Sequence, residues 1–482
     1  MYSLKQLVIS GRKRRWILMD LETSLPLLYP LRYHIDHLAF RSLSTQSASL
    51  QSVKFFYEFW RQKYGVSFCY SFYSSDHNPD IAVGEMPAFW MYLENGHNVQ
   101  SNVLSLTRVT KANSLTHTVR VRAVIHFISF LINTYISPAY RDDSPKALSL
   151  LASRLHTRLQ LCRENYRTLT SNKFSQHSHS SQGFQSLSGA MVLSLYGIIT
   201  PSSAQKHNPL NPFPSGHLQF RNFLIIRLLL NYGLRTGELL LLECSSIKPN
   251  LKGDKFSLIV TTVDEAYEPR KNAPSLKNAW ANRVLELDKQ DYIFLSIYIA
   301  KLRPKTDKHD FIFTSSQQSA KPLSYTSVHS IFSKIDQVFT NQYPEYKSPL
   351  YSDSLQRLTP HTTRHTWAFL TLQKIWHLKY LKSQQNKTHF IAEVPSLSGI
   401  MEEAKDELRL MGGWSPTSQM PDLYAKRFLS EQANAANVQR IIQDNAALHN
   451  TLDTIMGNDS NLLIVFYVQI MPDDFVMQLH RF

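Results

Sequence analysis

The segment GLRTGELLLL, residues 233–242, places Arg235 between two glycines and then continues as an apolar run. An apolar pattern at helical spacing over residues 217–232 leads into it. Glycines beside an arginine suit a close approach of the backbone to a phosphate, because glycine has no side chain to obstruct it. Glu238 follows three residues later, so on a helical turn it shares a face with Arg235. The segment therefore indicates an anion-binding turn, although an arginine and a glutamate on an exposed helix end would share this pattern.

Downstream of this segment the chain is mixed in character. Strand-like runs are followed by a mostly helical pattern from about residue 324 onward. The runs are FSLIVTTV (256–263), RVLEL (283–287) and DFIFTS (310–315). This order predicts an α+β domain that is mainly helical and has a small sheet near its start.

Upstream, the apolar spacing is helical over residues 31–65 and again over 103–165. Two polar, loop-like stretches, residues 171–189 and 201–216, then indicate a connection between domains. We expect five parts in all. They are a basic N-terminal extension (1–30), a helical domain (31–170), a linker (171–215), a mixed domain (216–430) and a C-terminal helix with a tail (431–482).

Composition narrows the class of partner. The 482 residues include 52 Lys and Arg against 37 Asp and Glu, for a net charge of +15. Such an excess favours a polyanion, nucleic acid first and a membrane surface second. Neither the apolar run before Arg235, which Arg227 interrupts, nor Leu462–Val468, which is too short, is expected to span a bilayer.

Cysteine and histidine usage gives little sign of a metal site. The three cysteines lie far apart and form no CxxC, so a disulfide framework and a Cys-rich zinc site are both unexpected, and a reducing compartment fits. His177 and His179 form an H-x-H pair in the linker, but without a nearby ligand cluster the pattern indicates a solvated polar segment.

The residues that could carry chemistry form a series along the chain. Single motifs of this kind arise by chance, so their order and context carry the evidence. The series is Arg235 in GLRTGELLLL, Lys277 in PSLKNAWANRVLEL (274–287), His361 and Arg364 in PHTTRHTWAF (360–369), Trp414 in LMGGWSP (410–416), and Tyr424 in DLYAKRF (422–428). This series resembles the tyrosine recombinase, or phage integrase, family over residues 216–430. The helical region before it more loosely resembles the core-binding domain of that family.

The resemblance implies a fold and a reaction. The fold is multidomain, with an all-α, SAM-like core-binding domain and a mainly helical α+β catalytic domain with a small antiparallel sheet. The reaction cleaves and rejoins DNA through a 3′-phosphotyrosyl link formed by Tyr424. Bond energy stays in this link, so neither a cofactor nor a metal is implied.

Each side chain in the series has an expected role. Arg235 and Arg364 would neutralise the phosphorane-like transition state, because guanidinium forks bind non-bridging oxygens in pairs. His361 would act as base for the tyrosine or as a hydrogen-bond donor. Lys277 would protonate the leaving 5′-oxygen, with Lys271 as the rival.

Three further residues complete the expected site. In the family an acid at the position of Glu238 supports the catalytic arginine and histidine. Trp414 stands where most members have a second histidine and some have tryptophan, so it could donate a hydrogen bond but could not relay a proton. The spacing from Trp414 to Tyr424 is about one residue longer than usual, and Gly413 is an extra glycine. His365 is expected to be a packing residue.

By resemblance the partner is double-stranded DNA, bound by a homotetramer on two sites, with accessory bending or directionality proteins and no membrane. A C-terminal helix, here residues 431–450, would pass to a neighbouring protomer or fold back on its own domain. A mobile-element origin and a bacterial, nucleoid-associated cytoplasmic location are expected on the same basis. A type IB topoisomerase and a non-catalytic DNA-binding protein are the alternatives.

Overall fold

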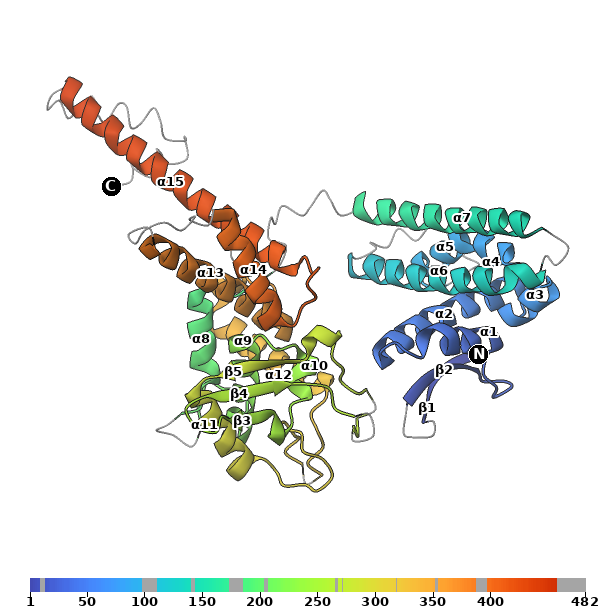
Figure 1. Cartoon of the computed structure of the whole chain (residues 1–482), viewed down its shortest axis with the longest axis horizontal. Helices are drawn as coiled ribbons and strands as arrows, with labels where there is room; N and C mark the ends of the chain where they lie inside the picture. The colour runs from blue at the N-terminus through green and yellow to red at the C-terminus, as the bar shows by residue number, and fades with distance from the viewer. Residues whose placement is uncertain are drawn as a thin grey trace. The chain divides into compact units, whose positions relative to one another are not determined.

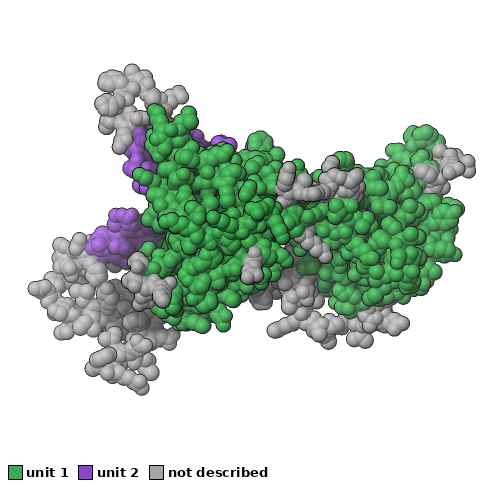
Figure 2. All heavy atoms as spheres, turned by 90° about the horizontal axis from the view of Figure 1, so that it is seen from below, with its two compact units in different colours: residues 1–366 green, residues 367–482 purple. Residues whose placement is uncertain are grey.

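The computed structural model describes residues 1–8, 14–97, 111–139, 144–172, 185–202, 207–264, 268–270, 272–317, 319–351, 354–386 and 397–456. Two compact units make up the chain, Met1–Thr366 and Trp367–Phe482 (Figure 2). His177, His179, Lys271 and the tail from residue 457 onward lie outside the described residues.

The first part of the larger unit is helical and is preceded by a hairpin (Figure 1). Its elements are β1 (Tyr2–Val8), β2 (Arg14–Asp20), α1 (Leu28–Tyr33), η2 (His34–Leu38), α2 (Leu43–Tyr64), α3 (Phe68–Ser74), α4 (Asp80–Gly84), α5 (Met86–Glu94), α6 (Lys111–Ala139) and α7 (Pro145–Asn172). Helix α2 begins where the Ser42 hydroxyl accepts from the Thr45 amide, and it ends at Gly65, whose φ of +74° needs glycine. An aromatic core that includes Phe56 and Phe127 holds these helices together.

The β1–β2 hairpin occupies the segment for which the sequence indicated only a basic extension. Its strands are antiparallel, with Leu4 opposite Leu18. Tyr2 and Leu18 are buried in the aromatic core, and Leu4 packs against it. The hairpin therefore belongs to the helical part, and its short apolar face between basic residues explains why the sequence did not reveal it.

One stretch of α6, Thr116–Ser137, is long and apolar enough to cross a membrane by length and composition. Of its most apolar window, 56% is buried inside the structure. The core helix of a globular bundle has the same properties.

The second part of the larger unit has its own hydrophobic core. Its elements are α8 (Gly189–Ile199), α9 (Gly216–Asn231), α10 (Thr236–Leu240), η3 (Cys244–Ser246), β3 (Ile247–Pro249), β4 (Phe256–Val260), η5 (Ala279–Ala281), β5 (Arg283–Leu287), α11 (Lys289–Ile297), η6 (Tyr298–Leu302), α12 (Tyr325–Gln342) and η7 (Pro344–Lys347). Helix α13 (Pro360–Asn386) begins in this unit and continues into the smaller one. Helix α8 packs on α9 and α12, so part of the expected linker contributes to this core.

The sheet is antiparallel, in the order β3–β4–β5, with Val260 opposite Arg283. Two of the three expected strands are present, as β4 and β5. The prediction of a strand at 310–315 was wrong, because that segment makes only isolated bridges, Glu243 to Phe311 and Thr314 to Pro322. The third strand is the short β3, which has too few residues to show an alternating pattern.

The smaller unit contains the rest of α13, α14 (Leu397–Gly412) and α15 (Met420–Met456) (Figure 1). Helix α14 packs against the start of α15, where Lys405 bonds Asp422 at 2.5 Å. Every side chain described between Leu429 and Ala447 is exposed. The fold class expected from sequence is confirmed, since helices dominate and the sheets are small and antiparallel. The five domain boundaries remain a prediction.

Candidate active site

The turn that carries Arg235 depends on two glycines. Gly233 has a φ of +58°, a conformation that side chains with a Cβ rarely adopt. A Cβ on Gly237 would lie 2.5 Å from the Tyr325 hydroxyl and 3.2 Å from the Ser275 carbonyl oxygen. Both glycines of GLRTGE are therefore required by the local geometry, and they fix Arg235 at the start of α10.

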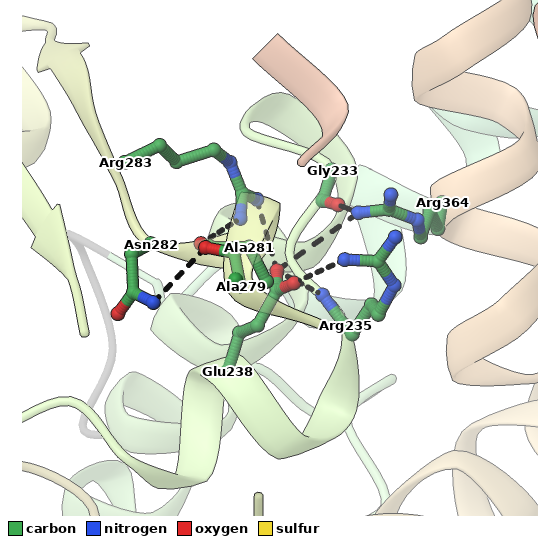
Figure 3. A network of polar contacts seen from close by, with 8 residues as sticks. All are labelled: Gly233, Arg235, Glu238, Ala279, Ala281, Asn282, Arg283 and Arg364. Atoms are coloured by element: carbon green, nitrogen blue, oxygen red, sulfur yellow. Dashed lines mark hydrogen bonds and ion pairs between the residues drawn. The ribbon is translucent and has the colours of Figure 1, made fainter. Parts of the chain in front are cut away.

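Glu238 is the centre of the site (Figure 3). It is 1% exposed, and its carboxylate faces three guanidinium groups. Oε1 lies 2.5 Å from Nη1 of Arg235, while Oε2 lies 2.9 Å from Nη2 of Arg283 and 3.9 Å from Nη1 of Arg364. Oε2 also accepts from the backbone amide of Arg235 at 2.9 Å. The carboxylate thus ties together α10, β5 and α13.

The charges at this centre decide its protonation. Burial alone would raise the pKa of Glu238, but the positive charges of Arg283, Arg364 and Arg235 outweigh it and hold the pKa below its usual value. Glu238 is therefore ionised at neutral pH. Three cations around one anion leave a net positive charge, which suits an anionic ligand.

His361 and Arg364 come from the first turn of α13. Arg364 is buried, and its guanidinium donates to the carbonyl oxygen of Gly233, which links α13 directly to the glycine turn. His361 keeps contact with solvent, yet partial desolvation and the cations of Arg364, Lys277 and Arg235 lower its pKa. A neutral imidazole at pH 7 follows, and such a ring can accept a proton.

His365 lies one helical turn after His361, with ring centroids 4.1 Å apart. It is 9% exposed. Burial, the neighbouring His361 and Arg364 lower the pKa of His365 to about 4. This burial agrees with the packing role expected for it.

Lys277 lies in the connection from β4 to β5 and is exposed. Its charge is close enough to contribute to the lowered pKa of His361. Arg270 lies in the same connection and holds it against the rest of the unit. It pairs with Glu268 at 2.7 Å and donates to the carbonyl oxygen of Leu323 at 2.8 Å. The rival Lys271 lies outside the described residues, so the choice between the two lysines stays a prediction.

The smaller unit carries Trp414 and Tyr424. The Trp414 ring lies 6.2 Å from that of Trp367 and 6.1 Å from that of Tyr424. Tyr424 is 1% exposed, in the first turns of α15. Gly412 and Gly413 make room for the indole, because a Cβ on Gly412 would lie 2.1 Å from the Trp414 ring and Gly413 has a φ of +60°. The extra glycine noted in the sequence is therefore part of the turn that positions Trp414.

The structure thus gathers Arg235, Glu238, His361, Arg364 and Lys277 in the larger unit and brings Trp414 next to Tyr424 in the smaller one. The sequence missed one member of the charge network, Arg283. A signal for it existed, because Arg283 is in phase with the buried Leu285 and Leu287 on strand β5. A charged residue on the buried face of a strand indicates an ion pair.

Among the described residues, no group of three or more His, Cys, Asp or Glu side chains is arranged to hold a metal ion.

Comparison with protein-family models gives a match over part of the chain. Residues 206–386 match the model of the phage integrase family. No curated protein sequence matches the chain. Among solved structures, the chain is similar to the Tn1549 transposon integrase in complex with circular intermediate DNA, at 13% identity and a TM-score of 0.34. The match covers 72% of this chain and 88% of that one. It is also similar to the XerH site-specific recombinase bound to difH substrate, at 13% identity, a TM-score of 0.33, and 74% and 96% coverage.

The matched segment contains the whole Glu238 network and the first turn of α13. Trp414 and Tyr424 follow it in the order that the motif series requires. Residues 206–386 of this chain are thus similar to the phage integrase family, the tyrosine site-specific recombinases.

Proposed function

We propose that this chain cleaves and rejoins double-stranded DNA at defined sites through a covalent tyrosyl intermediate, in the integration or excision of a mobile element. The observation that carries the proposal is the convergence of Arg235, Arg283 and Arg364 on Glu238, with His361 and Lys277 beside them. This arrangement is a positively charged site whose guanidinium groups match the oxygens of a phosphodiester.

The proposed first step is an in-line attack on phosphorus. The Tyr424 oxygen forms a bond to phosphorus, the bond from phosphorus to the 5′-oxygen breaks, and a 3′-phosphotyrosyl link results. His361, neutral because its pKa is lowered, accepts the phenol proton. Lys277 gives a proton to the departing 5′-oxygen. The step requires Tyr424 of the smaller unit to reach the phosphate bound by the larger unit, in the same chain or in a neighbouring one.

The second step reverses the first with a different strand. A 5′-hydroxyl from another DNA end attacks phosphorus and gives its proton to Lys277, the bond from phosphorus to the Tyr424 oxygen breaks, and His361 returns the proton to that oxygen. Arg235 and Arg364 stabilise the doubly negative transition state in both directions. Trp414 packs beside Tyr424, and in this proposal its indole N–H donates to a phosphate oxygen.

We propose further that the protein acts as a tetramer on two DNA sites, in the bacterial cytoplasm. The part of α15 from Leu429 onward supports this, because the side chains of Leu429, Val438, Ile441 and Ile442 are 52%, 54%, 42% and 62% exposed. Val438, Ile441 and Ile442 fall at helical spacing, so they form one apolar stripe. Such a stripe suits docking on a neighbouring protomer. The net charge of +15 suits the polyanionic DNA.

The experiment that tests the proposal captures covalent protein–DNA adducts. The full chain is incubated with host genomic DNA, denatured, and the attached DNA ends are sequenced. Tyr424→Phe should form no adduct while still binding DNA. Tyr380→Phe is the matched control, because it removes a phenol hydroxyl from the same unit. The Tyr380 ring stacks on that of Trp376, with centroids 5.3 Å apart, and phenylalanine can keep this stacking. Adducts scattered over many sequences would instead indicate a topoisomerase.

A further inference from the structure

Arg283 is a buried arginine with no place in the motif series. It begins strand β5, in phase with Leu285 and Leu287, and its side chain is 7% exposed. Nη2 contacts Glu238 Oε2 at 2.9 Å, and Nη1 donates to the carbonyl oxygen of Ala281 at 2.9 Å. These two bonds fix the plane of the guanidinium (Figure 3).

The three arginines around Glu238 are not equivalent. Arg283 is hydrogen-bonded to the carboxylate, whereas Arg364 approaches it only to 3.9 Å, beyond hydrogen-bond length. Arg235 also bonds the carboxylate, but its side chain is 18% exposed, more than twice the exposure of Arg283. Arg283 is thus the less exposed of the two arginines that hydrogen-bond the carboxylate. Arg364 is buried to the same degree, with a side chain 6% exposed, so the hydrogen bond to Glu238 is what distinguishes Arg283 from it.

The charge of Arg283 sets the net positive charge that the site can offer to a reacting phosphate. A buried carboxylate without a dedicated counter-ion would draw the charge of Arg235 and Arg364 toward itself. With Arg283 present, the site retains a charge of plus two, which equals the negative charge of a phosphorane-like transition state. Without it, only one positive charge would remain in excess.

We propose that Arg283 is a positioning residue that neutralises Glu238, so that Arg235 and Arg364 keep their charges for the scissile phosphate. The inference rests on the proposed function, because it assumes that the two arginines bind a DNA phosphate. Arg283 acts through Glu238 and does not touch the DNA. Since β5 follows the Lys277 connection, the same contact also joins that connection to α10.

The test measures single-turnover adduct formation on the DNA fragments recovered from wild-type adducts. Arg283→Gln should slow adduct formation about tenfold or more, equivalent to about 1.4 kcal/mol of transition-state stabilisation. Arg283→Lys keeps the charge and should retain more of the rate than the glutamine variant. Glu238→Gln combined with Arg283→Gln removes both charges of the pair, so the double variant should react faster than Arg283→Gln alone.

A matched control separates this effect from general loss of stability. Arg227 is paired with the buried Asp291 between α9 and α11, and Tyr232 bonds that carboxylate at 2.6 Å. Arg227→Gln removes the same charge and breaks a comparable pair, so it should lower stability but leave the rate of the folded protein unchanged.

Each outcome decides between the two claims. If the wild-type protein forms adducts and Arg283→Gln matches its rate, or the double variant is no faster than Arg283→Gln, the role of Arg283 is refuted and the proposed function stands. If the folded wild-type protein forms no adduct on any DNA, the proposed function fails, and the inference fails with it.

Discussion

The carboxylate of Glu238 lies 3.9 Å from the guanidinium of Arg364, although the two residues come from distant parts of the chain. Glu238 is in α10, directly after the glycine turn, and Arg364 is in the first turn of α13. Arg364 also donates to the carbonyl oxygen of Gly233 in the same turn. Two motifs that are separate in sequence are thereby held in one rigid, charged site.

Arg364→Lys tests whether the geometry of the guanidinium matters beyond its charge. Lysine keeps the positive charge but loses the planar fork that can hold two phosphate oxygens. We expect adduct formation to slow by about 100-fold, the scale seen when one stabilising donor is lost. A single-turnover cleavage assay measures this, with a DNA-binding assay as control. A lysine variant as fast as the wild type would show that charge alone suffices.

Gly412→Ala tests the turn that positions Trp414. The new Cβ would lie 2.1 Å from the indole, so the ring must shift and its packing against Tyr424 and Trp367 must change. We expect destabilisation of about 1–3 kcal/mol from overpacking. Gly197→Ala in α8 is the control, because a Cβ there meets nothing within 4 Å. Urea unfolding of both variants gives the comparison, and equal stabilities would argue against this account of the turn.

The buried His365 should lower the free energy of unfolding in acid. Burial, the neighbouring His361 and Arg364 hold its pKa at about 4, whereas the unfolded chain has the ordinary value near 6.5. The unfolded state therefore binds the proton more readily, and stability is present above about pH 6.5 and lost as the pH falls toward 4. This one residue should account for about 2–3 kcal/mol of that loss.

The measurement is the free energy of unfolding in urea at pH 7 and at pH 4.5. His365→Phe should show a smaller difference between the two values than the wild type. His329→Gln serves as control, because His329 is exposed on α12. If His365→Phe shows the same pH dependence of the free energy of unfolding as the wild type, His365 does not cause that dependence.

Charges placed on the exposed part of α15 should impair the assembly of protomers on DNA. Ile441→Asp with Ile442→Asp places charges in the apolar stripe, which would oppose docking on a neighbouring protomer. We expect the variant to remain folded, because both side chains are exposed, and to bind DNA as smaller complexes than the wild type. Light scattering of the DNA complexes measures their mass. Complexes of wild-type mass would assign another surface to assembly.

The sequence predicted the elements whose apolar spacing is long and regular. Helices α2, α6, α7 and α9 and strands β4 and β5 are present close to their expected positions. It did not reveal the β1–β2 hairpin, whose apolar face is short, or β3, which has only three residues. The segment 310–315 has the composition of a strand, but its backbone makes only isolated bridges.

For the site, the sequence supplied residue types and order, and the structure supplied partners. Glu238 was expected to support Arg235, and the two are indeed bonded. Arg283 was expected only as the basic first residue of a strand, because its pairing with Glu238 depends on how the sheet packs on α10. The catalytic roles of all the expected site residues remain predictions, namely those of Arg235, Glu238, Lys277, His361, Arg364, Trp414 and Tyr424.

The most direct test of the central claim is the capture of covalent adducts between the full-length protein and DNA, with Tyr424→Phe and Tyr380→Phe measured beside the wild type. We expect adducts at one or a few DNA sequences for the wild type and for Tyr380→Phe, with peptide mapping that places the DNA on Tyr424. We expect none for Tyr424→Phe, which should still bind DNA. Adducts that persist in Tyr424→Phe, or a folded wild-type protein that binds DNA and forms none, would contradict the claim.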